Sequence, residues 1–238
     1  MCGIVALLSR PSQRPVPSRE WLFGRLDDAL TALADGPVAV AATLEGVDAA
    51  LRGVPGVRAL VGHPEIAAGI TARLDMLDTY VSGLERELEG GGLLPAEVVE
   101  ETNAAIIRLR DAAWALRNDR LRTARAVEAL AGRDAPVSAL QGYLLVQQAL
   151  SILDRLEVRG RDSAGLHLFV WDHGLDLGDP AVRSLLEQRA GDPLFTSGSV
   201  RVAGPALSFV YKAAAEIGEL GDNTRTIRQA IDNDSLLR

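Results

Sequence analysis

Apolar residues recur at spacings of three and four along most of the chain, which is the period of a helix buried on one side. Ser18 is the expected N-cap of the first such helix, and the glycines at 90–92 separate the second from the third as an antiparallel hairpin. Residues 38–64 stay open, because 38–43 fit a strand and 47–51 fit a short helix. The pattern predicts helices over residues 18–34, 66–88, 99–130, 138–156, 181–189 and 221–230.

Other stretches favour strands. Residues 3–8 form a short continuous apolar run, which is typical of a strand buried on both faces. Residues 165–171 alternate between apolar and polar positions, which predicts a strand with one buried face. Residues 206–213 predict a further strand with Phe209 and Tyr211 on the same face. The sequence therefore predicts a protein of the α+β class.

Composition and charge narrow the class of protein. The chain has 238 residues, of which 47% are hydrophobic, enough for one sizeable core or for one core plus a satellite domain. Its net charge of -7 gives no basic footprint for nucleic acid or for an anionic membrane. No apolar run approaches the roughly 18 residues that a membrane span needs, and no signal peptide is expected. The single cysteine suits a reducing compartment, so we expect a cytoplasmic protein.

Cys2 follows the initiator methionine directly, and this position bears on its chemistry. Removal of Met1 would leave a thiol and a free α-amine on the same residue. That amine, with a pKa of about 7.7–8.0, can act as the general base for the thiol, and no histidine is needed. Taken alone, Cys2 also fits a small inert hydrophobe at the start of a strand.

Two segments resemble one enzyme family. Residues 1–5 are Met-Cys-Gly-Ile-Val and look like the start of class II glutamine amidotransferases, whose mature chains begin Cys-Gly-Ile. Residues 155–166 are R-L-E-V-R-G-R-D-S-A-G-L and resemble the helix-turn-strand signature of the glutaminase domain of the glucosamine-6-phosphate synthase type. Because both segments occur, and in this order, the chain is identified as similar to that family.

The resemblance implies a fold and a set of site residues. The fold is the four-layer αββα sandwich of N-terminal-nucleophile enzymes, here partial and with an inserted helical subdomain. Cys2 is the implied catalytic nucleophile, and Arg159 and Gly160 are implied to border it. Arg159 and Gly160 also fit plain structural roles, as a cation and a left-handed cap at a helix C-terminus. The residues implied to hold the turn are Asp162, Ser163 and Gly165.

The implied activity is the hydrolysis of L-glutamine. The Cys2 thiolate attacks the side-chain amide, ammonia leaves, and water hydrolyses the thioester to glutamate. In full-length members of the family the ammonia passes to a sugar phosphate such as fructose 6-phosphate, a step of amino sugar biosynthesis. No cofactor is implied. No metal site is expected, since His63, His167 and His173 lack the spacing of a metal triad.

The match to the family is interrupted. It covers residues 1–10 and 138–238, so residues 11–137 are predicted to be a helical insertion into the glutaminase domain. The family's H-T-R-W-A and H-N-G segments, which grip the glutamine carboxylate and form the oxyanion hole, are not found. The glutaminase domain is therefore expected to be incomplete at its C-terminus, and the chain alone to be weakly active or inactive.

Other functions are kept open. An amidophosphoribosyltransferase type of glutaminase is the alternative within the family. The hairpin at 66–131 is also compatible with a non-catalytic module that binds a partner helix or forms a homodimer. A further interpretation is a degenerate relative that keeps the fold without catalysis, against which the intact Cys2-Gly3 pair argues.

Overall fold

The structure, a computed structural model, describes residues 3–90, 96–157, 162–195, 199–214 and 219–238. The chain divides into two compact units, and each is described by itself. The sheet unit consists of Met1–Ser9 and Leu145–Arg238, and the helical unit consists of Arg10–Leu144. The second boundary falls inside a long helix, α7 (Val137–Glu157), whereas the sequence-based division put it at the start of that helix.

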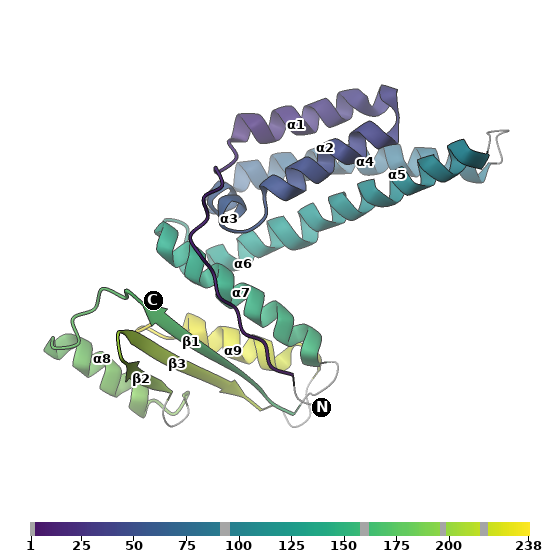
Figure 1. Cartoon of the computed structure of the whole chain (residues 1–238). Coiled ribbons are helices and arrows are strands. Elements are labelled where there is room, and N and C mark those ends of the chain that lie inside the picture. The colour runs from purple at the N-terminus through teal and green to yellow at the C-terminus, as the bar shows by residue number, and fades with distance from the viewer. Residues whose placement is uncertain (1–2, 91–95, 158–161, 196–198, 215–218) are drawn as a thin grey trace. The chain divides into compact units, whose positions relative to one another are not determined.

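The helical unit holds most of the helices (Figure 1). The predicted helices at 18–34, 66–88 and 99–130 are confirmed, and the open segment 38–64 is helical throughout its regular parts. Pro37 begins the first helix of that segment, a position that suits the fixed φ of proline. In chain order the elements are α1 (Arg19–Thr31), the 3-10 turn η1 (Ala32–Asp35), α2 (Pro37–Ala50), α3 (Val54–Leu60), α4 (Pro64–Glu89), α5 (Ala96–Ala115), the π-helical turn η2 (Leu116–Leu121) and α6 (Arg122–Ala131).

Aliphatic side chains fill the core of the helical unit. Ser18 caps α1 as predicted, because its Oγ accepts a hydrogen bond from the backbone N–H of Trp21 (3.2 Å). The apolar stripes predicted for α4 and α5 are buried, and α5 packs mainly against α2. The largest fully buried side chains of the helical unit are Leu22, Leu26, Leu44, Ile70, Leu74, Leu77, Leu109 and Leu116.

A buried ion cluster lies beside this apolar core. The Asp48 carboxylate of α2 accepts hydrogen bonds from Arg52 Nε (3.0 Å) and from Arg120 Nε (2.9 Å). Only 4% of the Asp48 side chain is exposed, so the two guanidinium groups compensate a charge that solvent does not reach. Arg120 lies in η2, the π-helical turn that follows α5. Arg120, a polar residue within the predicted helix at 99–130, is therefore an ion-pair partner of Asp48.

The sheet unit combines the end of α7 with a small antiparallel sheet. The predicted strands at 165–171 and 206–213 and the predicted helices at 138–156, 181–189 and 221–230 are confirmed. The sheet order in the described residues is β1-β3-β2, and Leu166 lies opposite Tyr211 in the register of β1 with β3. The elements that follow α7 are β1 (Ala164–Trp171), α8 (Pro180–Gly191), β2 (Val200–Ala203), β3 (Ala206–Ala213) and α9 (Asp222–Asp232).

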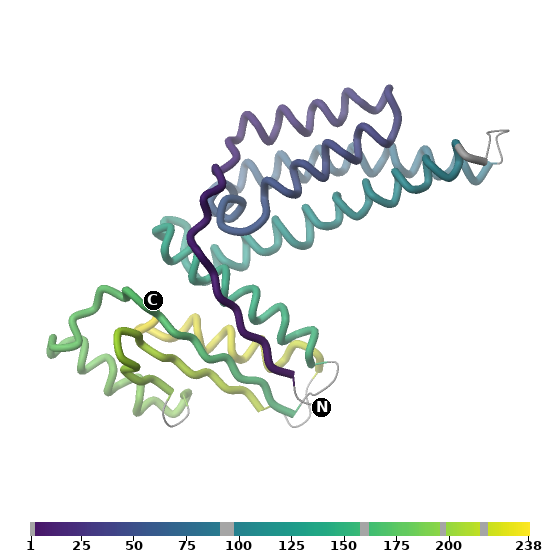
Figure 2. Tube along the Cα trace, viewed as in Figure 1, coloured from purple at the N-terminus to yellow at the C-terminus, as the bar shows by residue number. Residues whose placement is uncertain are grey.

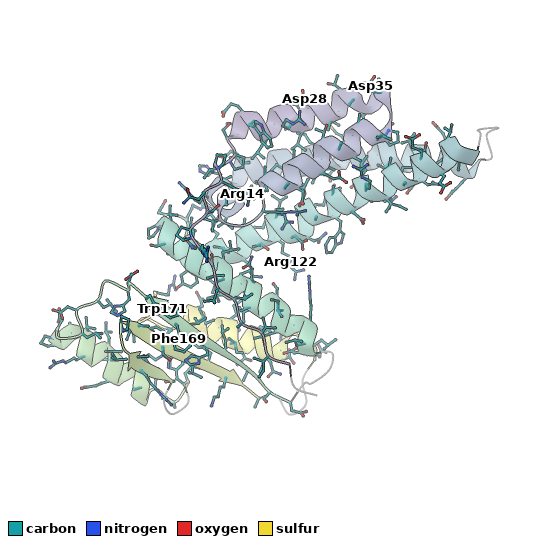
Figure 3. All side chains as sticks on the ribbon, in the orientation of Figure 1. Arg14, Asp28, Asp35, Arg122, Phe169 and Trp171 are labelled. Carbon is teal, nitrogen blue, oxygen red and sulfur yellow. The ribbon has the colours of Figure 1, made fainter. Side chains whose placement is uncertain are left out.

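The two faces of this sheet differ. The face that carries Leu166, Phe209 and Tyr211 is buried, and α9 packs on the sheet on this side, where Asp234 binds the Tyr211 hydroxyl (2.6 Å). The opposite face of β1 carries Phe169 and Trp171, which are 46% and 55% exposed (Figure 3). Their rings stack with centroids 5.8 Å apart. The predicted alternation along β1 is therefore correct, and its outward positions are aromatic.

The predicted strand at 3–8 is wrong. Residues 3–10 form no regular secondary structure, and the N-terminal trace runs extended up to α1 (Figure 2). Ile4 is 96% and Leu8 is 92% exposed, so the segment is not buried on either face. A strand needs a neighbouring strand for its backbone groups, and no strand of the described residues pairs with residues 3–8. The apolar run alone was therefore not a sufficient signal.

No sequence pattern predicts β2. Its four residues, Val200–Ala203, are too few to show an alternating pattern. The strand forms because Gly204, at φ 60°, turns the chain back so that Val202 lies opposite Leu207. The tertiary partner, and not the local pattern, makes this segment a strand.

Candidate functional site

The residues expected at the centre of the site, Cys2, Arg159 and Gly160, lie outside the described residues. Their described neighbours in sequence are Gly3 on one side and Glu157 and Asp162 on the other. The contacts of these described neighbours show what holds each of the two segments in place.

Gly3 lies against the last turn of α7. A Cβ built on Gly3 would be 3.0 Å from Leu156 Cδ2 and 3.2 Å from Leu156 Cδ1. Such distances are shorter than ordinary contacts, so a larger residue at position 3 would require the Leu156 side chain to move. The backbone after Cys2 and the end of α7 are therefore in van der Waals contact within the sheet unit.

Hydrogen bonds to the start of α9 fix the end of α7. The backbone N–H of Gly221 donates to Glu157 Oε2 (2.6 Å), and the Thr224 hydroxyl donates to Asp154 Oδ1. Gly221 has φ 91°, a conformation that favours glycine, and it is the N-cap residue of α9. These contacts fix the position of the C-terminus of α7, which ends at Glu157.

Glu157 is a functional candidate that the sequence analysis did not single out. The residue is only 3% exposed, and its second oxygen, Oε1, has no hydrogen-bond partner among the described residues. A buried carboxylate oxygen normally accepts at least one hydrogen bond. Glu157 belongs to the segment that resembles the family signature, and its place in that motif was the signal that could have found it.

The three residues predicted to hold the turn, Asp162, Ser163 and Gly165, lie in different local structures. Asp162 lies in a bend and Ser163 directly precedes β1, and both are exposed. Neither side chain has a hydrogen bond in the described part of the chain. Gly165 is not in the turn, because it is the second residue of β1 and lies opposite Lys212. A Cβ there would meet Tyr211 O at 3.6 Å, an ordinary contact, so packing does not demand glycine at this position.

A serine and a histidine meet on the sheet. His167 Nε2 and Ser208 Oγ are 2.6 Å apart across β1 and β3. In hydrolases such a pair needs a third group that orients the imidazole, and none of the described residues bonds the other ring nitrogen of His167. Ser208 is 4% exposed. We therefore assign this pair to cross-strand stabilisation.

Two groups in the described part of the sheet unit, Asp222 and Tyr211, have shifted pKa values. The backbone N–H of Glu219 donates to Asp222 and, together with Arg225, lowers the pKa of the Asp222 carboxyl. Burial and the hydrogen bond to Asp234 raise the pKa of the Tyr211 hydroxyl well above its ordinary value. Among the described side chains, no group of three His, Cys, Asp or Glu residues is placed to bind a metal ion.

Comparisons with known proteins add no relative. No protein-family model, no curated protein and no solved structure matches the chain. A search of the described helices for a membrane span finds none that is both long and apolar enough.

Proposed function

We propose that the protein is a glutamine amidotransferase that uses Cys2, after loss of Met1, as an N-terminal nucleophile. The observation that carries the proposal is the contact between Gly3 and Leu156. The reaction requires the nucleophile and the Arg159-Gly160 turn to lie together. The contact supports this because it joins the segment after Cys2 to the helix that leads into the turn.

In the proposed chemistry the N-terminal residue supplies both the nucleophile and the general base. The Cys2 thiol gives its proton to its own α-amine, and the sulfur forms a bond to the side-chain carbonyl carbon of L-glutamine. The carbon–nitrogen bond then breaks, and the α-ammonium returns the proton to the leaving ammonia. Water hydrolyses the thioester, which releases glutamate and restores the thiol. The ammonia acceptor is a sugar phosphate such as fructose 6-phosphate, with the amidophosphoribosyl type as the alternative.

The four-layer αββα sandwich is part of the proposal. In that fold, one helical layer covers the outer face of each sheet and the inner faces pack together. The packing of α9 on one face of the sheet supports the outer layer. The exposed rings of Phe169 and Trp171 on the other face support a second sheet at that position, since such an apolar face is costly in water. Residues 11–137 are then an insertion into this domain.

The test of the proposal is labelling of Cys2. Intact mass is measured before and after exposure to the glutamine mimic diazo-oxo-norleucine. We expect loss of Met1 and one adduct per chain, mapped to Cys2, in a chain that has no other cysteine. The Cys2→Ala variant should take up no label. Steady glutaminase turnover should be weak or absent.

A matched pair of arginine variants separates a site role from a general effect of charge. Arg159→Gln should slow labelling, because the proposal puts Arg159 beside the nucleophile. Arg155→Gln removes an exposed arginine from the last turn of α7 and should leave the rate unchanged. Retained Met1, or equal labelling rates in the two variants, would contradict the proposal.

A second candidate function has an observation of its own. Ile107 and Trp114 lie two helical turns apart on α5 and are 60% and 57% exposed. Such a pair favours a module that binds a partner helix or forms a homodimer. Light scattering of the Ile107→Ser/Trp114→Ser double variant tests it. A dimer of the unaltered chain that the variant loses would support the module, and a monomer in both would exclude self-association.

A further inference from the structure

A cavity of about 410 Å³ lies between α3, α4 and α6 of the helical unit. Its volume falls within the range of about 300–1,000 Å³ that small-molecule sites occupy. The hollow arises because α4 and α6 face each other here through alanines, whose side chains are too short to fill the space. Seven of the ten lining residues are apolar: Leu60, Pro64, Ala67, Ala68, Leu121, Ala124 and Ala129.

The charged residues that line the cavity carry a net positive charge. It consists of Arg125, Glu128 and Arg133. Both oxygens of the Glu128 carboxylate are already used, one by Arg133 Nε (3.2 Å) and one by the backbone N–H of Gly62 (3.0 Å). Arg125 is exposed, and no acidic side chain pairs with it in the described ranges. One guanidinium group therefore faces an apolar cavity without a counter-ion.

We propose that this cavity binds a small amphipathic monocarboxylate. The apolar body of the ligand contacts the alanines and leucines, where burial removes hydrocarbon surface from water. The carboxylate accepts hydrogen bonds from the Arg125 guanidinium, whose planar fork matches the two carboxylate oxygens. The site lies wholly within the helical unit, so it is independent of the proposed glutaminase chemistry.

Calorimetric titration of the full chain with octanoate tests the proposal. We expect one saturable site for octanoate and none for octylammonium, which has the same apolar body and the opposite charge. Inorganic phosphate should not bind, because it lacks the apolar body. Amide shifts of Ala67, Ala68 and Ala129 in a parallel NMR titration should report the position of the ligand.

Two matched pairs of variants assign the binding to this cavity. Arg125→Gln should weaken octanoate binding about tenfold, as expected for loss of a charge-assisted pair, while Arg122→Gln should not change it. Arg122 is an exposed arginine on the same helix and lies outside the lining (Figure 3). Ala68→Leu should fill the cavity and abolish binding, whereas Ala72→Leu, one turn further along α4, should retain it.

Each of the opposite results would overturn the proposal. They are the absence of saturable octanoate binding to the unaltered chain, equal binding of octylammonium or phosphate, and equal loss in Arg125→Gln and Arg122→Gln. Helical circular dichroism of each variant confirms that the substitution has left the unit folded. Loss of binding with loss of helicity in Ala68→Leu leaves the decision to the arginine pair, which changes only exposed positions.

Discussion

The two units of the chain differ in the kinds of side chain that they bury. The helical unit buries mainly leucine, isoleucine, valine and alanine, with Asp48 as its strongly buried charge among the described residues. The sheet unit, with a smaller apolar core, buries Glu157, Arg189 and Asp234 as well. A core of few strands and helices has less apolar surface to bury, so hydrogen-bonded charges take up part of its interior. We therefore expect single substitutions to act on the two units through different mechanisms.

The largest effect is expected at Asp234 in the sheet unit. Its Oδ2 binds both Arg189 Nε (2.9 Å) and the Tyr211 hydroxyl (2.6 Å), and neither charged side chain is more than 3% exposed. Asp234→Ala leaves the Arg189 charge buried without its partner, so the free energy of unfolding should fall by about 3–5 kcal/mol. Hydrogen exchange of the β3 amides measures the loss in this unit alone.

Asp232→Ala is the control for Asp234→Ala. Asp232 lies at the end of α9, is 49% exposed and pairs with Arg238 at 3.4 Å. An exposed pair of this kind contributes little, so β3 exchange should change by less than about 0.5 kcal/mol. Equal effects of the two alanine variants would contradict the inference that buried charges stabilise the sheet unit.

A somewhat smaller loss is expected in the core of the helical unit. Leu109 is fully buried on α5, so Leu109→Ala should cost about 3 kcal/mol through lost burial and a residual cavity. The hydrogen-exchange rates of the α5 amides should rise accordingly. Ile107→Ala, two residues away and 60% exposed, should stay within about 0.5 kcal/mol. If the β3 amides respond to Leu109→Ala as strongly as those of α5, the two units do not unfold separately.

The same contrast explains what the sequence could predict. In the helical unit the period of the apolar residues identified the helices at 18–34, 66–88 and 99–130, because one buried side is all that a helix needs from its surroundings. The segment of α2 and α3 stayed open. In the sheet unit the alternation identified β1 and β3. The run at 3–8 was wrongly predicted and the short β2 was missed, since a strand also depends on a partner that is often far away in sequence.

The candidate site was only partly predictable for a related reason. The motif identified Cys2, Arg159 and Gly160 by resemblance, and the structure does not describe these residues. The contacts that hold the end of α7, Glu157 with Gly221 and Asp154 with Thr224, join positions far apart in the chain. No local pattern specifies such pairs, so they emerge only from the tertiary structure.

A smaller effect is expected from the cap of α1. Ser18→Ala removes the acceptor for the Trp21 N–H, so the helical unit should lose about 1 kcal/mol. Ser82→Ala replaces an exposed serine inside α4, where alanine is the better helix former, and should be neutral or slightly stabilising. Urea midpoints followed by helical circular dichroism compare the two. A loss in both variants would mean that the serine hydroxyl at position 18 acts through something other than capping.

The smallest effect is expected when acid protonates the carboxylates of two surface ion pairs in the helical unit. The hydrogen bond from Arg73 lowers the pKa of Asp27, and the one from Arg108 lowers the pKa of Glu45. Because the folded carboxyls bind protons less tightly than the unfolded ones, their contribution is complete above about pH 4–5 and is lost as pH falls through the folded pKa values. Both pairs are exposed, so the urea midpoint of the helical unit should drop only slightly in this window, and added salt should shrink the drop. Arg73→Gln should remove the part of this drop in the urea midpoint that comes from Asp27. A pH response as large as the effect of Asp234→Ala would mean that surface charge, and not the aliphatic core, governs the stability of the helical unit.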